Sequence, residues 1–265
     1  MFKKIGIILV SIVVLIGVLF LYFDKNTKQD LVREAYIYGY PLITMDLVRK
    51  QETNVAFPDD SHAPMGQLIK MRTYPAVDNH TAAAPNAETL YTMVWYDLSK
   101  EPWIFSIPEI DNRYYIMPML SAFNEVFYVA GSRATGQKSQ TYVLTGPGWK
   151  GKLPEGIIEV KSPTALVWIL GRVYCTGSKE DYKLVHQLQD QFQSIPLSSF
   201  GKPYSPTKAV VDTSIDMKTS VRDQVNNMPL EEYFTYVSEL LKKNPPKPED
   251  APLMSRLAEI GIVPG

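Results

Sequence analysis

The most pronounced pattern along the chain is an apolar run near its start. From Ile5 to Phe23 there are nineteen residues without a charge, mostly Ile, Val and Leu, and Asp24 ends the run. A helix of this length spans about 28 Å, close to the thickness of the hydrocarbon core of a bilayer. Bulky residues stand where a cleavage site would need small ones. The pattern predicts an uncleaved transmembrane helix in an anchor segment, residues 1–27.

The orientation of this helix follows from its position at the start of the chain. We expect the N-terminus to lie inside, because only a few residues precede the run, as in a signal anchor. Basic residues also follow the run, at Lys25, Lys28 and Arg33, so charge alone does not fix the orientation. A buried core helix is the disfavoured alternative, since a helix that is apolar on all sides rarely serves a soluble core at a chain terminus. The sequence predicts a single-pass membrane protein with an extracytoplasmic soluble domain, periplasmic or at the cell surface.

After the anchor, the spacing of apolar residues is first helical and then irregular. Apolar residues recur every three or four positions from Leu31 to Lys50, which predicts a helix. Gly39 and Pro41 interrupt this pattern and predict a kink or two shorter helices. Residues 53–85 look irregular, with one short helix expected around Met65 to Met71.

The middle of the chain changes to the pattern of strands. Short runs of β-branched and aromatic residues are separated by turn signals rich in Gly, Pro, Asn and Asp. Seven strands are expected: Glu88 to Leu98, Trp103 to Ile107, Arg113 to Leu120, Glu125 to Val129, Gln140 to Thr145, Ile157 to Val160 and Leu166 to Cys175. Strands at this spacing predict an antiparallel sandwich or barrel.

Helical spacing returns at the end of the chain. Three helices are expected: one that begins after Ser178 with a capping box to Asp181, one from Pro229 to Lys243, and one over Ala251 to Ile260, capped by Asp250 and ended by Gly261. The fold class is therefore α+β, an antiparallel β-sandwich with N- and C-terminal flanking helices after one transmembrane helix. We expect three parts: the anchor, a sandwich module with its leading and capping helices over residues 28–195, and a helical segment over 196–265.

Charge and cysteine content narrow the function classes. The chain has 27 basic and 28 acidic residues, with a net charge of −1, and no dense basic stripe. Nucleic-acid binding is therefore disfavoured. Cys175 is the only cysteine, so no internal disulfide can form, and its apolar neighbours indicate a small buried side chain rather than a reactive thiol. No motif indicates a cofactor, and none is expected.

Polar residues gather just before the first strand. Asn86 and Glu88 lie where a turn enters the strand, with Thr89 and Tyr91 following. With Arg72 and His80 upstream, these residues can form a site for a small polar ligand: Arg72 for an anion, Glu88 and His80 for proton transfer, Asn86 and Tyr91 for orientation. In the alternative interpretation, Asn86 bonds its own turn, Glu88 pairs with Arg72, and Tyr91 belongs to the core.

Two other kinds of site are weakly indicated. The three histidines, His62, His80 and His186, lie in separate segments without a short-spaced partner, so no metal site is expected. Gly146 to Lys152 fits the spacing of a phosphate-binding loop, but Leu153 stands where that loop needs Ser or Thr. A glycine-rich turn between strands explains it better.

Several segments together are similar to one family. Arg72–Pro75, Pro85–Tyr91, Trp95–Leu98, Gly131–Gly136, Gly146–Trp149, Ser162–Arg172 and Asn244–Pro246 resemble the domain-of-unknown-function 1254 family. The resemblance covers about Leu31 to Gly265. It implies a jelly-roll-like β-sandwich with flanking helices, often in exported proteins, without a settled reaction. The positions it marks for a site are Arg72, Asn86, Glu88, Thr89, Tyr91, Trp95 and Arg133.

The chain departs from the family pattern in two respects. Ala87 and Glu88 replace the middle pair of the usual Asn-Asn-Asp-Thr-Leu-Tyr motif. Relatives usually continue into a second β-rich module, and this chain stops at Gly265, about where that module would begin. We therefore expect an unpaired surface on the sandwich or the last helices, and a partner protein that supplies the second module.

Two functions remain open at this point. In the first, the protein is a membrane-anchored envelope module that binds a ligand or a partner protein. In the second, it is an extracytoplasmic hydrolase- or lyase-type enzyme acting on a small polar substrate, with Glu88 as the candidate general base.

Overall fold

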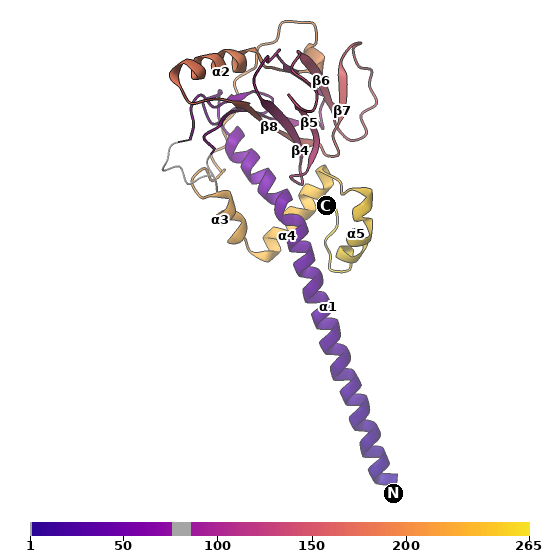
Figure 1. Cartoon of the computed structure of the whole chain (residues 1–265). Helices are drawn as coiled ribbons and strands as arrows, with labels where there is room; N and C mark the ends of the chain where they lie inside the picture. The colour runs from indigo at the N-terminus through magenta and orange to yellow at the C-terminus, as the bar shows by residue number, and fades with distance from the viewer. Residues whose placement is uncertain (1, 76–85) are drawn as a thin grey trace.

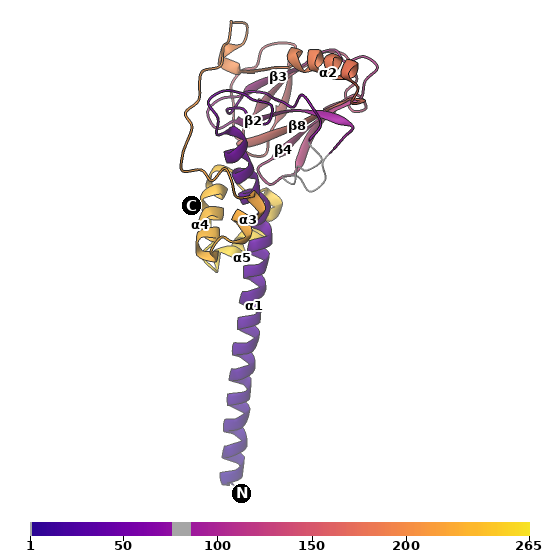
Figure 2. The same cartoon turned by 90° about the vertical axis from the view of Figure 1, so that its left-hand side faces the viewer.

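The described part of the chain is built from two β-sheets packed face to face and a layer of helices. The computed structural model describes the backbone of residues 2–75 and 86–265, and the side chains of residues 28–75 and 86–265. The sheets lie together at one end of the molecule, and the long N-terminal helix leaves them and ends far from them (Figure 1). Three C-terminal helices surround this helix close to the sheets, as the view in Figure 2 also shows.

Among the residues that the structure describes, nine strands make up the two sheets. Sheet A has the order β1 (Ile69–Lys70), β2 (Thr89–Asp97), β8 (Leu166–Tyr174), β4 (Tyr115–Ser121) and β5 (Val126–Gly131). Sheet B has the order β7 (Ile158–Lys161), β6 (Gln140–Thr145), β3 (Trp103–Ile107) and β9 (Gln193–Pro196). All pairs are antiparallel except β6 with β7, which is parallel. The predicted α+β class with antiparallel-rich sheets and flanking helices is confirmed, and the β6–β7 pair corrects its purely antiparallel form.

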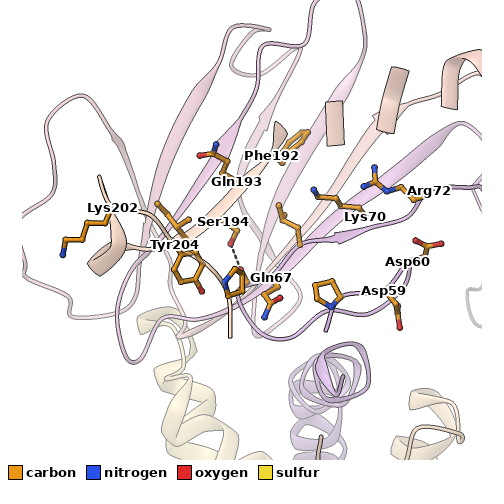
Figure 3. Close-up of a pocket in the computed structure, with 15 residues that line it drawn as sticks. Asp59, Asp60, Gln67, Lys70, Arg72, Phe192, Gln193, Ser194, Lys202 and Tyr204 are labelled. Carbon is orange, nitrogen blue, oxygen red and sulfur yellow. Dashed lines mark hydrogen bonds between the residues drawn. The ribbon is translucent and has the colours of Figure 1, made fainter. Parts of the chain in front are cut away.

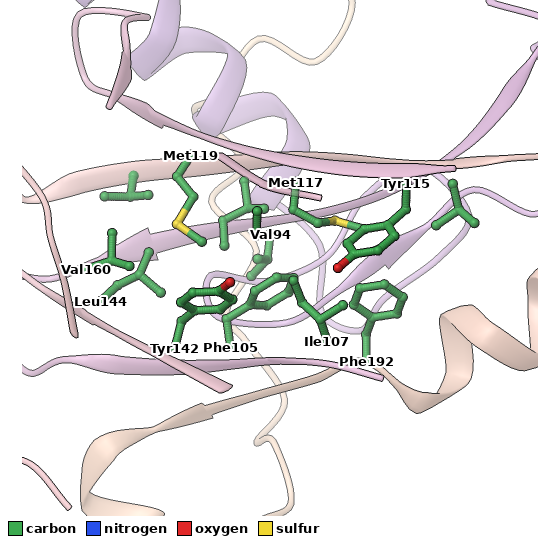
Figure 4. Packing of buried hydrophobic residues seen from close by; sticks show 14 of the residues in the cluster. Val94, Phe105, Ile107, Tyr115, Met117, Met119, Tyr142, Leu144, Val160 and Phe192 are labelled. Atoms are coloured by element: carbon green, nitrogen blue, oxygen red, sulfur yellow. The ribbon is translucent and has the colours of Figure 1, made fainter. Parts of the chain in front are cut away.

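The main core fills the space between the sheets. Along β4, Tyr115, Met117 and Met119 are fully buried and point toward sheet B. Phe105 and Tyr142, also fully buried, meet them from β3 and β6 (Figure 4). Alternate residues of each strand thus supply the core, as the period of two in the sequence predicts.

The structure contains two short strands that the sequence pattern did not predict. Strand β1 replaces the short helix expected around Met65 to Met71, so that prediction is wrong. Gly66 has a φ of +79°, which ends helical geometry there, and Ile69 pairs with Met93 of β2. Strand β9 directly follows helix α2 (Lys179–Gln191) and pairs with β3.

Helix α1 (Phe2–Thr53) is continuous through Gly39 and Pro41, so the alternative of two shorter helices is wrong. Gly39 is required by packing, because a Cβ there would collide with Val237 Cγ2 and lie 3.3 Å from the Tyr233 hydroxyl. Helix α4 (Leu230–Lys243) therefore approaches α1 at this point. The interruption in the pattern marks a close helix contact rather than a break.

The helical layer has its own core. It joins α1, α3 (Val221–Asn226), α4 and α5 (Ala251–Ala258) to the outer face of sheet A, with the short helices η1 (Leu197–Ser199) and η2 (Pro248–Asp250) in the connections. Helix α4 buries Tyr233, Val237, Leu240 and Leu241, whereas Leu230 is 56% exposed. The predicted start of α2 is confirmed, since the Ser178 side chain accepts a hydrogen bond from Asp181 N.

The predicted anchor is not tested by these observations. In the part of the chain that the structure describes, no helix combines the length and the apolar character that a membrane span requires. Ile5 to Phe23 lies outside the residues whose side chains are described. Membrane attachment and orientation therefore stay predictions.

Candidate functional site

The predicted site residues lie in separate places. Arg72 follows β1 and is held against α2, where its Nη2 lies 2.5 Å from Asp190 Oδ1 and its Nη1 donates to His186 O and Gln189 Oε1, each at 3.2 Å. The ion-pair partner of Arg72 is thus Asp190, not Glu88 as in the alternative interpretation. The guanidinium is fixed in position by three acceptors from one helix.

The polar groups of the turn before β2 form hydrogen bonds with one another, as the alternative interpretation predicted. Glu88 N donates to Asn86 Oδ1 at 2.7 Å, and Asn86 Nδ2 donates to the Thr89 hydroxyl. Glu88 is exposed at the mouth of the strand, whereas Thr89 is buried. His80, which was proposed for proton transfer, lies outside the described residues.

Trp95 faces the helical layer instead of a ligand site. Its indole Nε1 donates to Glu52 Oε2 at 2.7 Å, and its ring stacks on Trp168 with centroids 4.8 Å apart. The Trp168 Nε1 is buried and has no hydrogen-bond partner among the described residues. Burial raises the pKa of Glu52 to about 7, although the bond from Trp95 opposes this shift. Sequence reasoning did not single out Glu52.

We expect the substitution Glu52→Gln to stabilise the protein at pH 8 and to leave its stability at pH 4 unchanged. Between the unfolded pKa of about 4.3 and the folded value near 7, the folded state binds a proton that the unfolded chain lacks, so stability falls as pH rises. Glutamine keeps the acceptor for Trp95 without the charge. Because Glu52 is partly enclosed, we expect a gain of about 2 kcal/mol at pH 8. Urea unfolding at both pH values measures it, and an equal effect at pH 4 and pH 8 would contradict the assignment.

A groove of about 660 Å³ lies between the edges of the two sheets, where β1 ends sheet A and β9 ends sheet B (Figure 3). Its lining residues come from β1, β9 and two loops: Pro58, Asp59, Asp60, Gly66, Gln67, Leu68, Lys70, Arg72, Phe192, Gln193, Ser194, Ile195, Lys202, Tyr204 and Pro206. The site therefore exists because both edge strands are short and leave the side of the sandwich open.

Ser194 connects the two edges of the groove. Its hydroxyl donates to Gly66 O at 2.6 Å and lies 2.9 Å from the hydroxyl of Tyr96, which is fully buried. Gly66 packs on the ring of Trp103, since a Cβ at residue 66 would overlap that ring. These contacts fix the positions of the two strand edges relative to each other.

Two carboxylates are held ionised here: Asp190, beside the groove, and Asp59, which lines it. Burial would raise the pKa of Asp190, but Arg72 and Lys70, whose Nζ lies 3.3 Å from Asp190 Oδ1, together lower it. Burial likewise opposes the lowered pKa of Asp59, whose carboxylate accepts the backbone N–H groups of Ser61 and His62. Permanently ionised groups suit ligand binding better than proton transfer near neutral pH.

A second hollow of about 440 Å³ adjoins the groove, because Gln67 and Tyr204 line both. The irregular segment 202–220 runs beside both hollows. The side chain of Asn54, just after α1, holds this segment: its Nδ2 donates to Asp212 O at 2.9 Å, and its Oδ1 accepts a hydrogen bond from Asp212 N at 2.7 Å. The helical layer thus helps to fix the groove's outer wall.

Metal ligands do not gather at the groove. Over residues 28–75 and 86–265, no group of three or more His, Cys, Asp or Glu side chains is arranged to hold a metal ion. His62, near the groove, has its Nδ1 3.2 Å from Asp59 Oδ1.

The part of the chain that contains the strands matches a known family. Residues 65–196 match the family described as "Protein of unknown function (DUF1254)". This segment is a DUF1254 domain. The DUF1254 domain contains all nine strands and α2, whereas α1 and α3 to α5 lie outside the matched range. No curated protein matches the chain.

A solved structure supports the fold. The chain is similar to the VPA0106 protein from Vibrio parahaemolyticus, with 24% sequence identity and a TM-score of 0.65. The similarity covers 89% of this chain and 52% of that chain, so this chain spans about half the length of VPA0106. At this identity the likeness shows a shared architecture that includes the helices around the DUF1254 domain.

Proposed function

We propose that the protein is a binding module of the cell envelope, held at the membrane by residues 1–27, that takes a small polar ligand between β1 and β9. The observation that carries this proposal is the groove itself. It is concave, it lies at the junction of two rigid sheets, and it combines fixed cations with amide and hydroxyl groups. The partner protein with a second β-rich module stays a separate prediction.

The lining chemistry favours a sugar or sugar acid. Gln67 and Gln193 offer amide groups, which can exchange hydrogen bonds with ligand hydroxyls. Tyr204 adds an aromatic ring, and Lys70 and Lys202 can attract a carboxylate. The enzyme hypothesis finds less support, because Asn86, which would orient the substrate, is engaged with Glu88 N and Thr89.

We expect the full-length chain in nonionic detergent to bind glucuronate, and to bind glucose more weakly because glucose lacks the carboxylate. The substitutions Lys202→Gln and Gln193→Ala are expected to weaken glucuronate binding, each by about tenfold at most. Saturation-transfer NMR and calorimetry measure the binding.

The matched control for these variants is Lys161→Gln. Lys161 lies on β7, at the opposite edge of sheet B, with its side chain 80% exposed. If Lys161→Gln weakens glucuronate binding as much as Lys202→Gln does, the effect of both substitutions is a nonspecific effect of charge. Absence of saturable binding of both sugars would refute the proposed ligand class.

A further inference from the structure

Outside the groove, two arginines lie over tyrosine rings on sheet A. The guanidinium carbon of Arg172, on β8, is 5.1 Å from the centroid of the Tyr91 ring on β2. That of Arg133, just after β5, is 5.4 Å from the ring of Tyr114, just before β4. Each cation is attracted by the electron-rich face of its ring, which restrains the guanidinium there.

Both pairs lie on the face of sheet A that points away from the sandwich core. Val173 and Tyr115 are fully buried in that core, so their neighbours Arg172, Tyr174 and Tyr114 point the other way. Tyr174 is 43% exposed, and its backbone N–H donates to Tyr114 O at 2.9 Å.

The strand register arranges these side chains side by side. Arg172 lies opposite Tyr91 on one side and Ile116 on the other, and Ile116 lies opposite Gly131, two residues before Arg133. Tyr91 and Arg172 therefore lie at one level of the sheet, and Tyr174 and Tyr114 lie at the next level on the same face, with Arg133 beyond Gly131. We call this patch from four neighbouring strands or their ends the arginine–tyrosine row: Tyr91, Arg172, Tyr174, Tyr114 and Arg133.

The two arginines of the row differ from all the other arginines of the chain. Six of the eight arginines form an ion pair with a carboxylate: Arg33, Arg49, Arg72, Arg113, Arg222 and Arg256. Arg133 and Arg172 have no ion-pair partner among residues 28–75 and 86–265. Stacking on a ring leaves the N–H edges of a guanidinium available, and these edges match the oxygens of a carboxylate or phosphate.

We propose that the arginine–tyrosine row binds an elongated ligand with an anionic group at each end. One carboxylate or phosphate binds Arg172 and the other binds Arg133, and the middle of the ligand lies over Tyr174. Strands β8 and β5 are separated by two strand spacings, about 10 Å, and the Arg172 guanidinium lies over Tyr91 of β2, on the side away from β5. The two anionic groups must therefore lie at least about 10 Å apart. This site is independent of the groove between β1 and β9.

The test uses the full-length chain in nonionic detergent and two probes, octanedioate and octane-1,8-bisphosphonate. Calorimetry should give saturable binding of at least one probe, and the stronger of the two distinguishes a carboxylate from a phosphate site. Butanedioate, which is too short to reach both arginines, should bind about tenfold more weakly. Arg133→Gln and Arg172→Gln should each weaken binding by about tenfold.

Arg222→Gln is the matched control, because Arg222 is 79% exposed on α3, away from sheet A. Arg133 is exposed, so its removal leaves the fold intact even if Arg172→Gln impairs folding. Three results overturn the proposal: no saturable binding of either long probe, equal binding of the short and long dicarboxylates, or loss of binding with the groove variant Lys202→Gln but not with Arg133→Gln.

Discussion

Replacing Gly66 with alanine is expected to destabilise the protein by about 3 kcal/mol or more. Gly66 has a φ of +79°, a region that costs an L-residue about 1 kcal/mol or more. An added Cβ would also lie 2.6 Å from Trp103 Cζ2 and closer to two other atoms of that ring. Trp103 stacks on the buried Tyr96, with ring centroids 5.2 Å apart, so it has little room to move. Urea unfolding followed by circular dichroism measures the loss.

Gly136→Ala separates the two causes. Gly136 also has a positive φ, +89°, but an added Cβ there meets nothing within 4 Å. We expect this variant to lose only the backbone part, about 1 kcal/mol. Equal losses for the two variants would mean that the Trp103 contact is not the main cause. Because the Gly66 carbonyl also accepts the Ser194 hydrogen bond, a folded Gly66→Ala protein should have an altered groove.

The substitution Asp46→Ala is expected to cost about 3 to 4 kcal/mol. Asp46 is 7% exposed, and its carboxylate accepts hydrogen bonds from Arg49, at 3.0 and 2.8 Å, and from the Tyr236 hydroxyl. Lys50 Nζ lies 3.2 Å from the same carboxylate and 2.6 Å from the Tyr236 oxygen. Removing Asp46 leaves two partly buried cations and a hydroxyl without their shared acceptor, which is the costly way to break such a network. Thermal and urea unfolding check the value.

Asp30→Ala is the control for this effect. Asp30 also pairs with an arginine three residues later on α1, but both side chains are at least 63% exposed, so we expect a change below about 0.5 kcal/mol.

The Asp46 network also predicts a pH dependence of the free energy of unfolding. Burial alone would raise the pKa of Asp46, but Arg49, Tyr236 and Lys50 hold it below its ordinary value. Its stabilisation is therefore present above pH 4 and is lost as pH falls through the lowered pKa, and Asp46→Ala should remove this acid-side loss.

The sequence predicts seven of the nine described strands well, because each of these seven carries a local signal. Trp103 to Ile107 and Gln140 to Thr145 appear with the bounds that their β-branched and aromatic residues predict. Strands β1 and β9 have no comparable signal, since they contain two and four residues and exist through pairing with distant partners. The groove lies between these two strands, so the local pattern of apolar and polar residues does not predict where it lies.

The contacts of the candidate site residues differ for a similar reason in how far the sequence encodes them. The Asn86 turn is a local feature, and its internal hydrogen bonds follow from its own sequence. The contact between Glu52 and Trp95 joins residues 43 positions apart, and that between Arg72 and Asp190 joins residues 118 positions apart. Such contacts depend on how α1 and α2 pack on sheet A, which periodicity does not encode. Tyr91 and Arg133 were marked through the family resemblance, whereas their neighbour Arg172 depends on the register of β8.

Helix α1 fixes how the domain is rotated about the helix axis relative to residues 1–27. Its 52 residues form one uninterrupted helix, and its C-terminal part is packed into the helical layer and against Trp95. Each residue of a helix turns the chain by about 100° and advances it by about 1.5 Å. One residue inserted in the exposed stretch before Leu31 would therefore rotate the whole domain about the helix axis by roughly a quarter turn relative to residues 1–27. The number of residues in this one helix thus sets the direction, about the helix axis, in which the groove opens.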